Sequence, residues 1–270
     1  MNSLTSIADS LANALRQQTV TSSASWELTL AGQAYEVQDR LLAALGLEIG
    51  GWKVGAPDAS GEPHTAPIPK DWILPGGSEL AESAPLVEVE VAVRLGVDLD
   101  SARDLPSARE FALSLDASCI AMESVATRLS EGVGATQFAK LADLQSHRAL
   151  VLGPPLPAVA ADFDLRQTQA RLFVDEQMTV DTVGGNPAQD MWRLLAWLAR
   201  HCAERGVPLR KGQWVTTGSC TGLTAIRPGQ AVRGEIAGLG IVHTVRATEA
   251  TVPIRSSATP STNRPLKLPP

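Results

Sequence analysis

Two segments near the start of the chain carry apolar residues at helical spacing. In residues 3–17 apolar side chains recur every three or four positions, and residues 30–45 repeat this pattern before Gly46. Such spacing places the apolar side chains along one face of a helix, and glycine commonly follows the last helical turn. The sequence therefore predicts two amphipathic helices in this region.

From residue 49 onward the pattern changes to alternation with a period of two. The clearest case is residues 86–96, where four valines occupy one face of a predicted strand and Glu88, Glu90, Ala92 and Arg94 the other. A helix is predicted over 106–115 and a longer one over 187–205. Further strands are predicted at 49–55, 117–125, 148–152, 214–217, 231–236 and 240–246, together with a hairpin over 165–183 that turns at Asp175–Glu176.

Two segments show neither period. Residues 56–85 are rich in proline and glycine and contain His64. Because a long loop in a compact domain is usually functional or mobile, we expect a lid over a site here, with His64 as a candidate acid/base in that lid. Residues 251–270 contain five prolines and no apolar period, so we expect a flexible tail.

Composition narrows the class of protein. The chain has 270 residues, a 19% share of charged residues and a net charge of −6. Those values predict one mixed α and β domain rather than a disordered chain, and they disfavour nucleic-acid binding, which depends on Lys and Arg. No segment has the length and apolarity of a signal peptide or a membrane span. Three widely spaced cysteines, without a CxxC pair, predict neither a disulfide framework nor a zinc site, so we expect a cytoplasmic protein.

The alternating strand over 86–96 carries the first candidate chemistry. Glu88 and Glu90 point to the same face about 7 Å apart, so both could bind one divalent cation. Carboxylate oxygens suit Mg²⁺ or Mn²⁺. The same alternation is also typical of a half-exposed strand with a solvated glutamate face. Spacing alone does not decide between these two interpretations.

Glu123 and Lys53 add to the metal interpretation. Glu123 lies in a mostly apolar predicted strand, where a carboxylate needs a proton, a cationic partner or a metal ion. Three converging carboxylates repel one another unless a cation lies between them. Lys53 follows Gly50, Gly51 and Trp52 in another strand, where burial would lower its pKa and suit it to acid/base work or to orienting an anion. A lysine whose amine reaches water is the alternative.

The run from Val215 to Gly222 is rich in glycine and hydroxyl side chains. Its hydroxyl and backbone N–H groups, Thr217 among them, could bind a substrate carboxylate. Cys220 in the same run has no histidine context that would make it a nucleophile. The four histidines show no metal-binding spacing.

Several short pieces, in this order and at these separations, give the chain a family resemblance. It resembles the 2-keto-4-pentenoate hydratase / 2-oxohex-3-enedioate decarboxylase branch of the fumarylacetoacetate hydrolase superfamily from about Ala34 to Arg246. The pieces are Ala34–Gln38, Gly51–Gly55, Val87–Ala92, Ala121–Glu123, Asn186–Pro187, Trp197–Ala199, Gly212–Ser219 and Gly238–Gly240.

The resemblance implies a fold and a set of roles. The fold is α+β, a mixed β-roll with an N-terminal helical region and flanking helices, in a homo-oligomer. One Mg²⁺ or Mn²⁺ is held by Glu88, Glu90 and Glu123, and Lys53 is the catalytic residue. Substrate-binding positions are Thr217, Ser219 and Arg128. On this basis we expect a helical region and lid over 1–80, a metal-binding core over 81–250 and the tail over 251–270.

The implied reaction is metal-dependent addition of water to a 2-hydroxypenta-2,4-dienoate-type acid from aromatic breakdown, giving a 4-hydroxy-2-oxo acid. Decarboxylation of a 2-oxo-3-enedioate and C–C hydrolysis of an acylpyruvate are alternatives at the same metal site. Ala126 and Leu144 depart from the family pattern, which usually has Asp and Asn there. A catalytically silent partner protein, or a relative that only binds small acids, is therefore a further hypothesis of another class.

Overall fold

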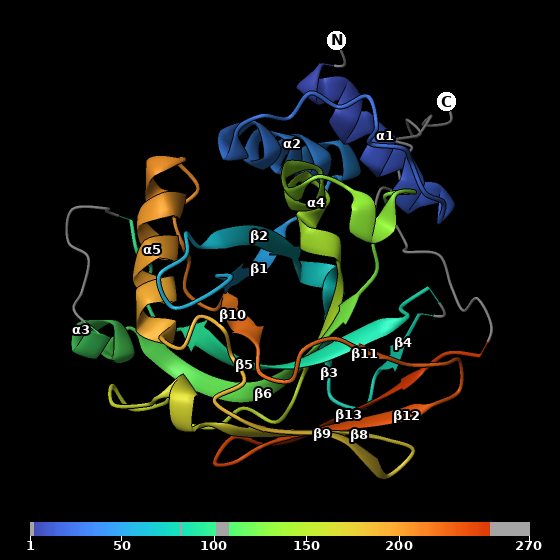
Figure 1. Cartoon of the computed structure of the whole chain (residues 1–270). Coiled ribbons are helices and arrows are strands. Elements are labelled where there is room, and N and C mark those ends of the chain that lie inside the picture. Colours follow the sequence, from blue (N-terminus) through green and yellow to red (C-terminus); the bar gives the residue numbers. More distant parts are fainter. Residues whose placement is uncertain (1–2, 82, 101–107, 249–270) are drawn as a thin grey trace, which may run out of the picture.

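The computed structural model describes residues 3–81, 83–100 and 108–248 (Figure 1). Helices α1 (Leu4–Gln17) and α2 (Ala31–Leu45) confirm the two N-terminal predictions. Ser3 caps α1 by accepting a hydrogen bond from the Ser6 N–H, and Gly46 ends α2 with a positive φ of 66°. The two helices pack together with α4 (Gln137–Ala142) around one apolar cluster at the top of Figure 1.

An eight-stranded mixed sheet forms the centre of the molecule. Its order is β2-β1-β10-β5-β6-β7-β3, and β11 pairs with β5 beside β10. β1 pairs in parallel with β10, whereas β5 is antiparallel to both β10 and β6. The strands are β1 (Ile49–Gly55), β2 (His64–Pro69), β3 (Ile73–Pro75), β5 (Leu86–Leu95), β6 (Leu115–Val125), β7 (His147–Leu152), β10 (Trp214–Ser219) and β11 (Thr224–Ala225).

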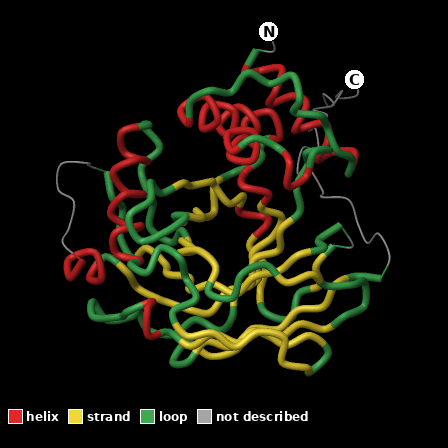
Figure 2. Tube along the Cα trace, in the orientation of Figure 1, coloured by secondary structure: helices red, strands yellow, loops and turns green. Residues whose placement is uncertain are grey.

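A five-stranded sheet packs beneath the first one (Figure 2). Its order is β4-β13-β12-β8-β9. The valine face of β5 lies between the two sheets, and all four valines are fully buried. Helix α5 (Met191–Glu204) packs on the same core and α3 (Ala108–Leu113) packs beside it. The strands are β4 (Glu79–Leu80), β8 (Gln169–Val174), β9 (Gln177–Val183), β12 (Ala231–Ile236) and β13 (Gly240–Arg246).

This architecture confirms the α+β fold with a curled mixed sheet and flanking helices. The hairpin prediction is also confirmed, because β8 and β9 turn at Asp175 and Glu176, both with positive φ. The long helix begins later than expected, at Met191, where the Asp190 side chain accepts hydrogen bonds from the first turn. The start of the helix expected over 106–115 falls outside the described residues, and so does the tail prediction.

The long loop expected over 56–85 is interrupted by strands, so the prediction of one continuous loop is wrong. The segment contains the edge strand β2 and the short strands β3 and β4. β2 tolerates Pro67 and Pro69 because it pairs on one side only, with β1, so the missing N–H groups face no partner strand. Residues 56–63 remain a loop, as do residues 76–78 between β3 and β4. The central sheet therefore contains strands from both sides of residue 80, where a boundary between two regions was expected. That boundary stays a prediction.

Among the described residues, the structure contains no helix that is long and apolar enough to cross a membrane.

Candidate metal centre

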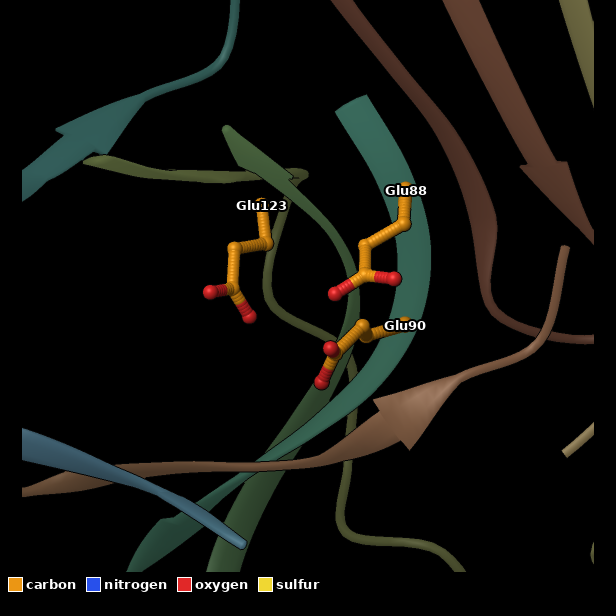
Figure 3. Close-up of side chains that lie close together, drawn as sticks. All are labelled: Glu88, Glu90 and Glu123. Atoms are coloured by element: carbon orange, nitrogen blue, oxygen red, sulfur yellow. The ribbon is translucent and has the colours of Figure 1, made fainter. Parts of the chain in front are cut away.

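Three glutamates from two neighbouring strands converge on one point (Figure 3). Glu88 on β5 lies directly opposite Glu123 on β6, and Glu90 is two residues further along the same face of β5. One carboxylate oxygen from each residue lies within 4.8 Å of the others. Glu90 and Glu123 are 1% and 0% exposed, and Glu88 is partly buried. The solvated-face interpretation of this strand is therefore wrong.

Lys53 supplies a positive charge to the cluster. It lies on β1, and its Nζ forms an ion pair with Glu123 Oε1. Burial acts to lower the lysine pKa, but Glu123, Glu88 and Glu90 outweigh it, so the pKa is raised. The expected lowering was wrong because it considered burial without the three carboxylates. Lys53 is accordingly a protonated acid and not a free base at neutral pH.

The pKa values of the three carboxyl groups are driven apart. Burial, followed by repulsion from Glu123, raises the pKa of Glu88 to about 7, and the same two causes raise that of Glu90 well above its usual range. Burial also opposes ionisation of Glu123, yet Lys53 and His147 lower its pKa to about 2. Three carboxylates facing one ammonium leave two negative charges in a buried place, which is the charge that one divalent cation balances.

The residues present fit such a cation. Glu123 Oε2 is buried and has no hydrogen-bond partner, although Oε1 has two. An orphaned buried carboxylate oxygen is costly unless a proton or a cation satisfies it. All three residues offer the hard oxygen ligands that Mg²⁺ and Mn²⁺ prefer, and their small number leaves positions for water and substrate.

His147 is a residue that the sequence analysis did not single out. Its Nδ1 lies 3.0 Å from Glu123 Oε1, and its ring stacks at a centroid distance of 6.0 Å on Trp72. The side chain is fully buried, and burial, as the first cause, lowers its pKa. A neutral imidazole can donate its Nδ1–H to Glu123 and fix that carboxylate. No spacing motif indicates this role, since the two residues come from separate strands, β7 and β6.

Glu88 and Glu90 line a cavity of about 790 Å³, and Glu123 lies directly opposite Glu88. Lys53, Glu88, Glu90, His64 and Ser219 all line the cavity, so the structure brings these predicted residues together.

The loop over residues 56–63 contributes to one wall of the cavity, through Ala56 and Pro57. Arg193 of α5 holds it by donating to the carbonyl oxygens of Gly61, at 2.9 Å, and Asp58, at 3.1 Å. Trp197 Nε1 also donates to Glu62 Oε1, at 2.9 Å. Residues 56–63 are therefore the part of the expected lid that remains a candidate to cover the site.

Two predicted substrate-binding residues make contacts within the protein. Thr217 is buried, and its hydroxyl donates to the Val91 carbonyl at 3.1 Å. Arg128 is buried in an ion pair with Asp143. The Gly218 N–H donates to Glu90 Oε2 at 3.0 Å, so this N–H of the glycine-rich run already binds a carboxylate of the protein. The substrate role of Thr217 and Arg128 stays a prediction.

The remaining sequence candidates are less reactive or differ from the family pattern. The three cysteines are free and buried, and burial raises the pKa of Cys220 to about 12, which argues against a thiolate nucleophile. Leu144, Gln145 and Ser146 all have positive φ, an unusual run for non-glycine residues. Gln145 lines the cavity, and its Nε2 is buried without a hydrogen-bond partner.

Comparison with known proteins gives consistent results. The model of the family described as fumarylacetoacetate (FAA) hydrolase C-terminal matches residues 57–246. The TodF product hydratase of Pseudomonas putida is 34% identical over 166 residues, covering 58% of this chain and 58% of that relative. A 2-keto-4-pentenoate hydratase of Paraburkholderia phymatum is 28% identical over 235 residues, covering 80% of this chain and 85% of the relative.

A solved structure shares the fold. The 4-oxalocrotonate decarboxylase from Pseudomonas putida G7, complexed with magnesium and adipate, superposes with a TM-score of 0.78 at 21% identity. The match covers 90% of this chain and 97% of that chain. At this identity the likeness shows the fold and not the reaction.

Proposed function

The chain belongs to the fumarylacetoacetate hydrolase C-terminal family, and from this premise we propose that it is a divalent-metal-dependent hydro-lyase. Its substrate is a 2-hydroxypenta-2,4-dienoate-type acid (2-keto-4-pentenoate), and its product is a 4-hydroxy-2-oxo acid. The observation that carries this proposal is the buried cluster of three carboxylates and one ammonium, of which Lys53, Glu88 and Glu90 line a cavity. Relatives named hydratases support the choice of reaction.

Glu88, Glu90 and Glu123 would hold the Mg²⁺ or Mn²⁺ ion. When bound, the ion supplies positive charge that stabilises the negative charge developing on the 2-oxygen of the substrate. The magnesium and calcium complexes of the structural relative support a divalent ion. Glu123 is held for this task by Lys53 and His147, which bind its Oε1 and leave Oε2 free.

Lys53 is the group that would move a proton. Because its raised pKa keeps it charged, Nζ can donate a proton to carbon 5 while the 2-hydroxyl of the dienol loses its own proton to water. This gives the 2-oxo-3-enoate, and the released proton restores the charge of Lys53. Water then adds its hydroxyl to carbon 4 and a proton to carbon 3, so the net change is the addition of one water molecule. Glu123 beside Nζ stabilises the charged form of Lys53 before the transfer. His64 in the cavity wall stays a candidate acid/base for the water step.

The C–C hydrolase alternative has one structural argument against it. Such a reaction uses a general base that reaches water, often a histidine paired with a carboxylate. The structure contains a His147–Glu123 pair, but the His147 side chain is 0% exposed. His147 therefore orients the Glu123 carboxylate, and its imidazole cannot act as a base on water in the cavity.

The test is turnover of 2-hydroxypenta-2,4-dienoate by the purified protein with Mg²⁺ or Mn²⁺. We expect its ultraviolet absorbance to decay, a chelator to stop the decay, and mass spectrometry to find a product heavier by one water. If the protein is given a 2-oxo-3-enedioate instead, a product lighter by one carbon dioxide would favour the decarboxylase alternative. No decay with either metal would contradict the proposal and favour a silent relative. The homo-oligomeric state and the cytoplasmic location stay predictions, the former testable by light scattering.

A further inference from the structure

The cavity is much larger than the five-carbon acid of the proposed reaction requires. Its volume is about 790 Å³. Protein cavities of roughly 300–1,000 Å³ bind ligands of drug size, whereas a five-carbon acid is far smaller. The space beyond Glu88 and Glu90 therefore has room for a larger substrate.

The strand register shows on which side of the carboxylates this space lies. On β5 and β6 the pair Glu88–Glu123 is followed outward by the pair Leu86–Val125 on the same face, about 7 Å away. Leu86 and Val125 both line the cavity. In the opposite direction, past Glu90, the same face is closed by a packed apolar cluster. That cluster consists of Ile68, Ala92, Cys119, Ala121 and Leu150, all fully buried.

Apolar side chains also line the outer part of the cavity, beside the polar Gln137 and Lys140. Val133 and Leu223 line it although they are 96% and 56% exposed, which places them towards solvent. They come from two separate segments, the short 3-10 helix Gly132–Gly134 and the loop over residues 220–223. Leu141 of α4 adds a buried apolar side chain to the wall. Exposed apolar side chains grouped at a cavity are typical of a binding surface.

Two of the polar side chains in the lining are already engaged. Lys140 Nζ donates to the Val133 carbonyl at 2.6 Å, and the Thr127 hydroxyl donates to Asp143 Oδ2 at 2.9 Å. Lys140 is the cation that could instead pair with a second carboxylate on a substrate, so a distal carboxylate is the competing occupant. The apolar pair Leu86–Val125 lies directly next to the metal-binding residues, and a distal carboxylate would lose hydration there.

We propose that the substrate is a 2-hydroxy-2,4-dienoate that carries an alkyl or aryl group on carbon 5. Its carboxylate and 2-oxygen would face the divalent ion that Glu88, Glu90 and Glu123 would hold. Its apolar group passes Leu86 and Val125 towards Val133 and Leu223. This inference rests on the proposed function, and the reaction is unchanged, because carbon 5 only receives a proton.

The test compares substrates that differ only on carbon 5: hydrogen, methyl, butyl, phenyl and carboxylate, each with Mg²⁺. We expect kcat/KM to rise with apolar size and to be at least about tenfold higher for phenyl than for hydrogen. A highest value for the hydrogen or the carboxylate compound would overturn the inference and leave the hydratase function intact.

A binding measurement separates the two proposals if no compound reacts. Unreactive 2-oxo acids with and without a terminal phenyl group are titrated into the protein with Mn²⁺ by calorimetry. Tighter binding of the phenyl compound supports the apolar passage even if the hydratase function fails. Equal or weaker binding overturns it.

Variants at the exposed end locate the effect. Leu223→Ser and Val133→Asp change exposed side chains, so we expect both proteins to fold. The ratio of kcat/KM for phenyl to that for hydrogen is expected to fall at least about threefold in each. Leu113→Ser, at another exposed leucine on α3, is the matched control and should keep the wild-type ratio. An unchanged ratio in both cavity variants would contradict the passage.

Discussion

Strands β5 and β12 share one pattern of alternating apolar and polar residues but have different surroundings. On β12, Val232 and Ile236 pack into the core, while Glu235 on the other face forms an ion pair with Arg233 of the same strand. The Arg233 guanidinium also lies 3.7 Å from the centre of the Phe173 ring. Glu235 therefore has a cation beside it on the five-stranded sheet, which it shares with the exposed Glu176.

On β5 the glutamate face is enclosed. Glu88 and Glu90, with Glu123 on the neighbouring strand, share Lys53 as their ion-pairing cation. Burial together with this shortage of positive charge raises the pKa of Glu88 to about 7. Alternation of apolar and polar residues therefore does not distinguish a metal site from an ordinary surface strand. The number of cations per buried carboxylate does.

The largest expected effect comes from Glu123→Gln, set against Glu235→Gln. Replacing Glu123 removes a charged ligand and keeps the side-chain volume. We expect Mn²⁺ affinity to fall by more than about 100-fold and hydration to be lost with it. Glu235→Gln removes a carboxylate from the same kind of pattern and should change neither. Mn²⁺ titration followed by electron paramagnetic resonance measures the affinity. Equal affinities in the two variants would refute the claim that Glu123, unlike Glu235, binds the metal.

Lys53→Met tests the cation of the cluster. We expect the hydration rate to fall about 10²–10⁴-fold, because a proton donor is lost. The Mn²⁺ affinity should hold or rise, because Glu123 Oε1 loses a competing ammonium. Lys211→Met, at an exposed lysine, is the control and should behave as wild type. If Lys53→Met loses Mn²⁺ as completely as Glu123→Gln does, the lysine only maintains the structure of the site.

These residues also show how far sequence reasoning reached. The alternation over 86–96 predicted β5, and the family resemblance assigned Lys53 and the three glutamates that the structure brings together. The direction of the Lys53 pKa shift could not be predicted, because it depends on distances to carboxylates on other strands.

What sequence reasoning missed is non-local in the same way. His147 contacts Glu123 only because β6 and β7 pair, and the spacing of residues along the sequence does not reveal that pairing. The proline-rich segment was expected to be a loop. It contains β2 because an edge strand can omit N–H donors on its free side. Tertiary pairing decided each of these cases.

His147 offers the next prediction, because it orients a carboxylate and does not itself reach the cavity. We expect His147→Leu to weaken Mn²⁺ binding about 10–100-fold, as loss of a residue that orients a metal ligand usually does. His147→Asn should recover part of the affinity, since its amide can donate in place of Nδ1–H.

The control for this prediction is His201→Leu, at a histidine that stacks on Trp197 at 4.5 Å. We expect it to lower the melting temperature by removing ring packing and to leave the Mn²⁺ affinity unchanged. Equal metal binding in His147→Leu and wild type would show that the histidine only fills space.

The smallest effect is on stability in the absence of metal. The Glu88 pKa is raised from 4.5 to about 7, so between these pH values the folded protein holds a proton that the unfolded chain has released. This contribution to the free energy of unfolding is complete below about pH 4.5 and is lost as the pH rises through about 7. Glu123 has the opposite shift, to about 2, and its contribution is lost only in stronger acid.

Comparing wild type with Glu88→Gln in the presence of a chelator isolates the contribution of Glu88 to the free energy of unfolding. His147 and His201 have lowered pKa values, but both residues are present in both proteins, so their contributions cancel. From pH 6 to pH 8 the wild type should lose about 1 kcal/mol relative to the variant, or about 2–4 °C in Tm. With Mn²⁺ present the sign should reverse, because the ion replaces the proton and binds more tightly at pH 8. If, without metal, the wild type instead gains stability relative to Glu88→Gln between pH 6 and pH 8, the prediction is contradicted. The negative charges of Glu88 and Glu90 would then be balanced by nearby cations as well as that of Glu235 on β12 is.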